Sequence, residues 1–201
     1  MTKRLLDIVL SALALIVLSP TLIAFALLIK REDGGPVFFR GIRVGRRGRP
    51  FHIFKLRTMV IDADKGGPLS TANDDPRITR IGRIIRRFNL DELPQFINVL
   101  KGEMSIVGPR PEVARYVEMF TEAEQAILMV RPGITDWATL WIRDEGKILA
   151  GSLDPDKTYL EKIRPEKLRL QLEYVRTNSL WDDLQIMLQT LKVHLVDRFK
   201  P

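Results

Sequence analysis

The chain has 201 residues, of which 45% are hydrophobic and 28% are charged, a composition that excludes wholesale disorder and suits one globular domain. It contains no cysteine, which excludes disulfides, thiolate metal sites and cysteine nucleophiles. The net charge of +7 and the pI near 9.9 indicate an anionic partner, which is a phospholipid, a nucleic acid or a phosphorylated substrate.

The N-terminal residues 1–31 predict attachment to a membrane. The run 8–29 has no charged residue and is long enough to cross a hydrocarbon core of about 30 Å. A secretory signal peptide is disfavoured, because the apolar run is long and no A-x-A-like cleavage site follows it. Ser19-Pro20 lies near the middle of the run and basic residues flank both ends. The residues alone therefore leave two topologies open, a spanning helix and a re-entrant hairpin with both ends in the cytoplasm.

A β-hairpin is predicted next, because residues 36–44 and 50–60 read as strands on either side of the glycine-bounded turn 45–49. Seven basic residues and no acidic one occur between Arg40 and Arg57. Strand alternation places Lys55 and Arg57 on one face of the hairpin. That face is either a phosphate-binding surface or a solvated edge strand whose charges discourage aggregation.

A helix with a basic side is predicted over residues 77–88. A row of arginines three or four residues apart lies beside an apolar row, as in helices that lie on a membrane surface. Two adjacent carboxylates, Asp91 and Glu92, follow at once. Carboxylates beside guanidinium groups indicate a site that handles phosphate with a divalent metal ion. The structural alternative is that Glu92 closes a capping box with Asn89 and that Asp91 is a first-turn acid. The arginines of the row are Arg77, Arg80, Arg83 and Arg87.

The remaining segments predict a mainly helical α+β fold. Residues 62–76 are rich in turn-forming residues and predict a surface loop over the site. A short helix is expected over 90–104, an amphipathic helix over 111–131, and two C-terminal helices over 166–178 and 179–198. The second of these opens with a capping box at Ser179 and Asp182. His52 and His194 have no partner at metal-ligand or triad spacing, so both are interpreted as structural.

The constellation around Asp91 favours phosphoryl chemistry by a carboxylate nucleophile, because cysteine is absent and the histidines are isolated. Repulsion between a carboxylate and an anionic phosphate has to be offset by cations. Magnesium on Asp91 and Glu92 suits this role, together with several basic side chains on the phosphate oxygens. The basic residues predicted for the site are Lys55, Arg57, Arg86 and Arg110.

Four blocks of the sequence resemble the bacterial sugar transferase family, and specifically its small PglC-like monotopic phosphoglycosyl transferases. They are KLRTM at 55–59, LDELPQ at 90–95, GEMSIVGPRP at 102–111 and RPGIT at 131–135. The blocks occur in order over nearly the whole chain. The resemblance implies transfer of a sugar-1-phosphate from a UDP-sugar to undecaprenyl phosphate with release of UMP, the first membrane step in the assembly of a glycoconjugate.

The same resemblance implies roles for individual residues. Asp91 is the nucleophile that forms a covalent phosphosugar intermediate, and Glu92 is its partner in a Mg²⁺-dependent pair. Arg86 and Arg110, with Arg131 of the RPGIT block, bind phosphate or substrate. Ser19 and Pro20 match the helix break of a re-entrant membrane helix, which gives a membrane segment at 1–31 and a catalytic domain at 32–201. The expected location is the cytoplasmic face of the bacterial inner membrane, on anionic phospholipid.

The sequence departs from the family pattern at one place, where Asp136 follows RPGIT instead of the usual glycine. An added acid there is expected to alter the sugar pocket. A competing class is a membrane-tethered nucleic-acid-binding protein, which gives the pair at 91–92 no role, and a third is a non-catalytic membrane scaffold. The transferase reading predicts no nucleic-acid partner and leaves a homodimer open.

Overall fold

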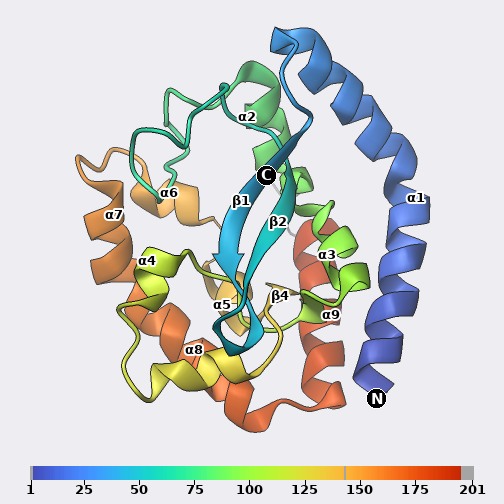
Figure 1. Ribbon diagram of the computed structural model, residues 1–201, viewed down its shortest axis with the longest axis vertical. Helices are drawn as coiled ribbons and strands as arrows, with labels where there is room; N and C mark the ends of the chain where they lie inside the picture. Colours follow the sequence, from blue (N-terminus) through green and yellow to red (C-terminus); the bar gives the residue numbers. More distant parts are fainter. Residues whose placement is uncertain (1, 143, 196–201) are drawn as a thin grey trace.

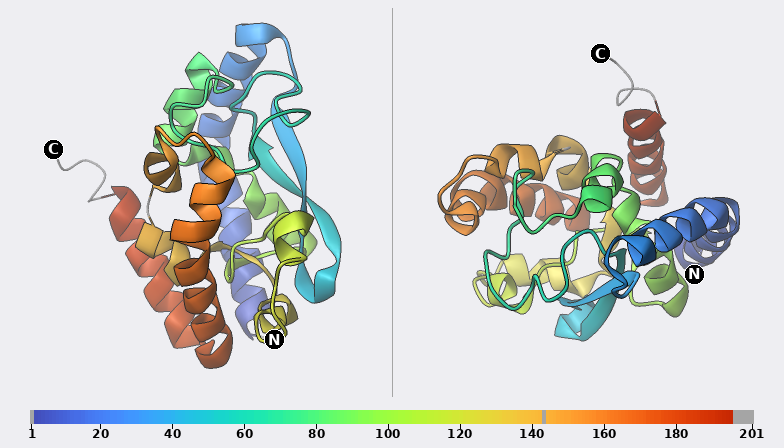
Figure 2. Two further views of the ribbon diagram at one scale, coloured as in Figure 1. Left: turned by 90° about the vertical axis from the view of Figure 1, so that its left-hand side faces the viewer. Right: turned by 90° about the horizontal axis from the view of Figure 1, so that it is seen from above.

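A computed structural model describes residues 2–142 and 144–195. The long helix α1 (Thr2–Asp33) runs along one side of the molecule, as Figure 1 shows, and the rest of the chain forms a body beside it. Strands β1 (Phe38–Val44) and β2 (Pro50–Leu56) lie at one face of this body, and helices α8 (Arg164–Thr177) and α9 (Leu180–Leu195) lie at the opposite face (Figure 2). The predicted mainly helical α+β class is confirmed.

Helix α1 is continuous over its whole length, and the structure does not show the predicted re-entrant hairpin. Its 32 residues correspond to a length of about 48 Å. It contains Pro20, which has no backbone N–H, and the Ser19 hydroxyl donates to the carbonyl of Ile16 at 2.8 Å. The helix curves in Figure 1, as a proline within a helix permits. By length and composition it is able to cross a membrane.

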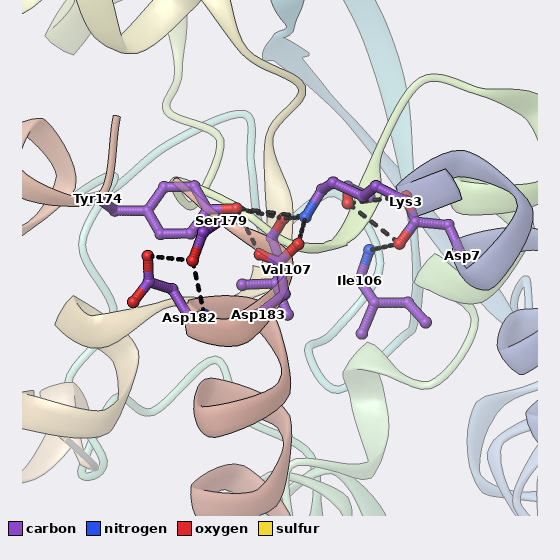
Figure 3. Close-up of polar contacts among 9 residues, drawn as sticks. Lys3, Asp7, Ile106, Val107, Tyr174, Ser179, Asp182 and Asp183 are labelled. Atoms are coloured by element: carbon purple, nitrogen blue, oxygen red, sulfur yellow. Dashed lines mark hydrogen bonds and ion pairs between the residues drawn. The ribbon is translucent and has the colours of Figure 1, made fainter. Parts of the chain in front are cut away.

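The N-terminal end of α1 is fixed to the body by polar contacts that are buried or partly buried (Figure 3). The Lys3 ammonium lies 2.5 Å from a carboxylate oxygen of Asp183 on α9, and it also donates to the Tyr174 hydroxyl at 3.2 Å. One helical turn further along, the Asp7 carboxylate accepts bonds from the hydroxyl of Ser105 and from the backbone N–H of Ile106. These contacts join α1 to α8, α9 and strand β3 (Ser105–Val107).

The C-terminal end of α1 is fixed to the same body. Asp33 accepts two bonds from the Arg57 guanidinium, at 2.5 and 2.6 Å, just after β2 ends. Between the ends, Ile29 packs with Leu56 and Ile85 in a buried cluster. Both ends of the long apolar helix therefore contact one folded domain.

The predicted β-hairpin is confirmed. β1 and β2 pair antiparallel, from Phe38 opposite Leu56 to Val44 opposite Pro50, and the short turn η1 (Arg46–Gly48) connects them. Residues Phe51 and Ile53 of β2 pack against α3 (Gln95–Lys101) and the residues after it. The Asn98 side chain of α3 completes this junction, since its oxygen accepts from the Phe54 N–H and its nitrogen donates to the carbonyl of His52.

The predicted basic helix begins later than expected, because α2 spans Arg80–Arg87 and Thr79 is its N-cap. Arg77 therefore lies outside the helix and does not share a face with the other arginines of the row. Its guanidinium instead donates to the carbonyls of Ala63, Gly66 and Pro68 and pairs with Asp75. The predicted loop 62–76 contains no helix or strand, and Arg77 holds it in a defined shape.

Helices of the C-terminal half pack against the parallel pair of strands β3 and β4 (Gly133–Thr135). Val107 of β3 contacts Tyr174 of α8 and Ile186 of α9 in a buried cluster that also includes Trp137. The remaining elements in chain order are α4 (Ala114–Val117), η3 (Glu124–Met129), α5 (Trp137–Ile142), α6 (Glu145–Leu149), α7 (Pro155–Thr158) and η4 (Tyr159–Ile163).

The single helix predicted over 111–131 is wrong, because the segment divides into α4 and η3. Thr121 and Glu124 form a capping box between them, which stops one helical segment and starts the next. The two C-terminal helices are confirmed, and the Ser179 hydroxyl accepts from the Asp182 N–H as predicted. The predicted end of the last helix at 198 lies outside the described residues.

Candidate active site

The adjacent acids Asp91 and Glu92 lie in the short turn η2 (Leu90–Glu92) between α2 and α3. Asn89 enters this turn with a φ of 53°, in the left-handed region that asparagine tolerates, and its side chain makes no cap hydrogen bond. The capping-box alternative for Glu92 is therefore wrong. The turn instead directs both carboxylates toward the hairpin and toward the Pro109-Arg110-Pro111 segment, where Lys55 and Arg110 meet them.

Glu92 is held by two cations. Arg110 donates through both of its terminal nitrogens, one to each oxygen of the carboxylate, and the bond to Oε2 measures 2.8 Å. The Lys55 ammonium donates to Oε1 at 2.8 Å. Burial alone would raise the pKa of Glu92, but the charges and hydrogen bonds of Arg110 and Lys55 outweigh burial and hold that pKa far below its usual range. Glu92 is therefore a permanently ionised anchor for both cations.

Asp91 differs from its neighbour in having free oxygens. It is 9% exposed, and within the described chain no donor forms a hydrogen bond to its carboxylate. The closest cation is the Lys55 ammonium, 3.5 Å from Oδ2. Burial raises the pKa of Asp91, and the charge of Glu92 adds to that rise, while Lys55, Arg86 and Arg110 oppose it. A carboxylate that is buried but not hydrogen-bonded is suited to react or to bind a ligand.

Asp91 and Glu92 open into a cavity of about 740 Å³ that lies between the hairpin, α2 and the C-terminal elements. A cavity of this size accommodates a ligand of several hundred daltons. Of the residues predicted for the site, Lys55, Arg86, Arg110, Asp91 and Glu92 all line it. Basic residues from three separate parts of the fold surround Asp91, whose only ion pair among the described residues is the 3.5 Å contact with Lys55, and such a group of cations suits an anion-binding site.

Arg57 and Arg131, also predicted for this site, lie elsewhere. Strand β2 ends at Leu56, so the alternation that placed Arg57 beside Lys55 no longer applies. Arg57 is 7% exposed, and its guanidinium pairs with Asp33 and donates to the carbonyl of Pro36. Arg131 donates to the carbonyl of Gly102 at 3.0 Å. Both side chains join segments of backbone, and neither lines the cavity.

The turn that carries Arg110 is held in place by a hydrogen bond to Asp136. This buried carboxylate accepts the backbone N–H of Arg110 at 3.2 Å, the N–H and hydroxyl of Thr139, and the side-chain amide of Gln171. Asp136 does not itself line the cavity, but its partners Arg110 and Thr139 do. An effect of this acid on a sugar pocket stays a prediction. An acid at this position joins the Arg110 turn to α5 and α8.

The two sequence blocks at 102–111 and 131–135 are adjacent in space, because β3 and β4 are parallel neighbours. A Cβ on Gly133 would lie 2.1 Å from the backbone nitrogen of Gly108, so the two chains approach as closely as only glycine allows. This approach places the turn that carries Arg110 directly after a paired strand.

Magnesium binding stays a prediction. In residues 2–142 and 144–195, no group of three or more histidines, aspartates or glutamates is arranged to hold a metal ion. Of the predicted pair, Asp91 has free oxygens, whereas both oxygens of Glu92 accept bonds from cations. The residues present fit the way Mg²⁺ commonly binds, through one carboxylate together with phosphate oxygens of a substrate.

Several cavity residues were missed or misinterpreted from the sequence. Arg83 and Arg87 were assigned to a membrane-facing row, yet they line the cavity beside Arg86. Asn89 was interpreted only as a helix cap. Arg43 was part of a basic strand whose solvated-edge alternative was left open. The spacing of arginines in 77–88 indicated that Arg83 and Arg87 share one side of a helix. It does not say whether that side faces the cavity.

Comparisons with known proteins show which family the chain resembles. The sequence model of the family described as bacterial sugar transferase matches residues 1–197. The chain is 42% identical over 195 residues to a UDP-glucose:undecaprenyl-phosphate glucose-1-phosphate transferase from Escherichia coli. This match covers 94% of the chain and 39% of the relative. It is 37% identical over 196 residues to a UDP-N-acetylgalactosamine-undecaprenyl-phosphate N-acetylgalactosaminephosphotransferase from Aeromonas hydrophila, covering 96% and 43%.

A third relative is more nearly the size of this chain. It is a UDP-glucose:undecaprenyl-phosphate glucose-1-phosphate transferase from Caulobacter vibrioides, 38% identical over 192 residues, with 94% of the chain and 68% of the relative covered. The chain spans about two fifths of the length of the Escherichia coli and Aeromonas relatives. The family match nevertheless runs through every element that builds the cavity. The chain belongs to the bacterial sugar transferase family.

Proposed function

We propose that the chain transfers a sugar-1-phosphate from a UDP-sugar to undecaprenyl phosphate, with Asp91 as a covalent nucleophile and UMP as the released product. The observation that carries this proposal is the group of cations around Asp91 in the cavity, where its carboxylate is buried and accepts no hydrogen bond from residues 2–142 or 144–195. The named relatives are transferases of this kind. A nucleic-acid-binding role is less well supported, because the cations line a cavity with acids in it and not a continuous surface.

In the proposed first step, an oxygen of Asp91 attacks the phosphorus that bears the sugar. A bond forms between that oxygen and phosphorus, the bond to the bridging oxygen breaks, and UMP leaves with its electron pair. In the second step, a phosphate oxygen of undecaprenyl phosphate attacks the same phosphorus and frees Asp91. Both nucleophiles are anions, so neither step needs a general base.

The cations make these steps accessible by offsetting charge. Lys55 and Arg110 remain close to Asp91 because Glu92 holds them, and Arg86 faces the same cavity. Fixed cations around the reacting phosphorus stabilise the charge that develops on its oxygens. Asp91, with phosphate oxygens of the donor, would hold Mg²⁺, which when bound would neutralise part of that charge.

We also infer that both ends of α1 lie on the cytoplasmic side of the bacterial inner membrane and that its apolar middle enters the lipid. Lys3 and Asp7 at one end, and Asp33 at the other, contact the same folded domain. A spanning helix would put one set of these partners on the far side of the bilayer. Ionic contacts cannot form across a hydrocarbon core, so the contacts support a re-entrant arrangement.

The transfer is tested with the purified full-length chain, Mg²⁺, undecaprenyl phosphate and a panel of UDP-sugars. A panel is needed because the relatives' names give both glucose and N-acetylgalactosamine. UMP release is expected with at least one donor, and release of UDP with every active donor would refute the mechanism. With a donor labelled at the sugar-bearing phosphate and no acceptor, label should attach to the protein. Asp91→Asn should lose the label, whereas the exposed control Asp64→Asn should keep it.

The topology is tested with single cysteines, which the cysteine-free chain makes unambiguous. Thr2→Cys and Arg31→Cys should both react with a membrane-impermeant maleimide only after the cytoplasmic face is exposed. Labelling of Thr2→Cys from the outside of intact cells would refute the re-entrant arrangement and restore a spanning helix.

A further inference from the structure

Arg43 lines the cavity, and its side chain lies along β1, the strand to which it belongs. It projects from the inward face of β1, two residues from Gly41, which lies opposite Ile53 in the hairpin. A Cβ built on Gly41 would lie 3.1 Å from a terminal nitrogen of the Arg43 guanidinium. The guanidinium therefore lies back along the strand and shares the space beside this glycine with the Phe39 ring, whose nearest carbon would lie 2.7 Å from such a Cβ. Arg43 and Ile53 both line the cavity.

Arg43 has donors without an anionic partner. Among the described residues, no carboxylate lies within 4 Å of its guanidinium, and its one side-chain hydrogen bond goes to the carbonyl of Ile42. Lys55 and Arg110, in contrast, are both paired with Glu92. Burial lowers the pKa of Arg43, and the nearby charge of Arg110 lowers it further, against Glu112 and Glu92. A partly buried cation with unused donors is prepared for an anion that arrives from outside the protein.

The position of Arg43 separates it from the arginines of α2 that also line the cavity. Arg83, Arg86 and Arg87 come from α2, which packs against the end of α1 that leads into β1 (Figure 1). Arg43 is the penultimate residue of β1, and this end of the strand lies away from α2 in the same view. The α2 arginines are thus on the side of the cavity nearer to α1, from which a lipid-linked phosphate would enter under the proposed function.

We propose that Arg43 binds the phosphate group that leaves as part of UMP, and so is a substrate-binding residue for the nucleotide donor and not for the lipid acceptor. This inference rests on the proposed function. A guanidinium offers paired donors that match two oxygens of one phosphate group. Bound there, it would offset the charge that the leaving phosphate gains when its bond to the sugar-bearing phosphorus breaks.

The experiment measures binding of UMP and of uridine to the full-length chain in nanodiscs by isothermal titration calorimetry. Arg43→Gln should weaken UMP about ten-fold, the effect of losing one charge-assisted contact, and leave uridine unchanged. Arg43→Lys keeps the charge and should weaken UMP less. The matched control Arg49→Gln removes an exposed arginine of the hairpin turn and should change neither ligand. Melting temperatures show whether each variant is folded.

Steady-state kinetics give a second measurement. In Arg43→Gln the KM for the UDP-sugar should rise while the KM for undecaprenyl phosphate stays constant. Equal UMP affinity in wild type and Arg43→Gln would overturn the inference and leave the proposed function standing. An equal loss of affinity for UMP and for uridine in Arg43→Gln would also overturn it, since Arg43 would then support the shape of the site and not contact the phosphate. Absence of UMP binding by wild type would overturn the proposed function together with the inference.

Discussion

Asp91→Asn and Glu92→Gln each remove one negative charge from neighbouring residues, and the structure predicts opposite effects on stability. Each substitution keeps the size of the side chain, so neither leaves a cavity. The difference between their effects on the free energy of unfolding therefore reports how strongly the fold stabilises each of the two carboxylates. Glu92 accepts bonds from Arg110 and Lys55 at both oxygens, whereas Asp91 accepts none in the part of the chain that the structure describes.

Glu92→Gln leaves Arg110 and Lys55 without their counter-charge. The side chains of Glu92 and Arg110 are 18% and 27% exposed, so water replaces only part of the lost interaction. Hydrogen bonds to charged groups contribute roughly 1.5–3 kcal/mol, and the expected loss in the free energy of unfolding is about 2 kcal/mol. For a chain of this size, that loss lowers the melting temperature by about 4–8 °C.

Asp91→Asn removes a charge that the fold disfavours, since burial raises the pKa of Asp91. Its nearest cation, Lys55, keeps the closer contact with Glu92 at 2.8 Å. Substitutions that relieve a destabilised functional residue commonly gain about 1 kcal/mol, which raises the melting temperature by about 2–4 °C. The variant should be more stable than wild type while losing UMP release altogether.

The pH dependence of the two effects also differs. A raised pKa means that the protonated form of Asp91 favours folding, and this contribution is lost as pH rises through the folded-state pKa. The advantage of Asp91→Asn should therefore be largest at pH 8 and shrink toward pH 4. Glu92 has a lowered pKa, so its contribution is present above its unfolded pKa of about 4.3 and persists at higher pH. The deficit of Glu92→Gln should be constant between pH 5 and pH 8.

The assay is differential scanning fluorimetry of the detergent-solubilised chain between pH 4 and pH 8, with a chelator present so that no metal ion shields Asp91. The exposed Asp64→Asn serves as the control for a charge change without burial. Equal destabilisation by Asp91→Asn and Glu92→Gln at every pH would refute the argument, because it would mean that the fold depends on both charges alike.

Three further predictions concern residues outside the pair. Arg77→Gln removes the side chain that holds the loop 62–76, so trypsin should cleave after Lys65 about ten-fold faster than in wild type, measured by limited proteolysis. Asp136→Asn should cost about 2 kcal/mol in a thermal melt and lower kcat for UMP release, because this carboxylate accepts four bonds. A double-mutant cycle of Lys3→Met and Asp183→Asn should give a coupling of about 1–2 kcal/mol in the same melt.

Local signals in the sequence predicted the elements that depend on neighbours along the chain. Glycines at 45 and 48 between apolar runs predicted the β-hairpin, and the capping box at Ser179 predicted the start of α9. The same kind of signal was overlooked at Thr121, where a capping box divides the predicted helix 111–131. That error came from following hydrophobic periodicity past a start signal.

Partners that are distant along the chain could not be predicted in this way. Asp33 and Arg57 are 24 residues apart, and Lys3 and Asp183 are 180 residues apart. Nothing in the local sequence indicates that Arg57 faces an acid of the membrane helix while Lys55 faces the site. Such choices depend on where β2 ends and on how α1 packs, and these are tertiary properties.

The pairing of the cations also decides what Glu92 can do during the reaction. Lys55 and Arg110 flank Asp91 only because Glu92 neutralises part of their mutual repulsion. If Glu92 left them to bind a metal ion or a substrate, the two cations nearest Asp91 would lose the contact that positions them. Glu92 is therefore better placed to act on Asp91 through Lys55 and Arg110 than by contacting substrate. Arg43 and Arg86, which pair with no carboxylate of the described residues, remain available for the phosphates.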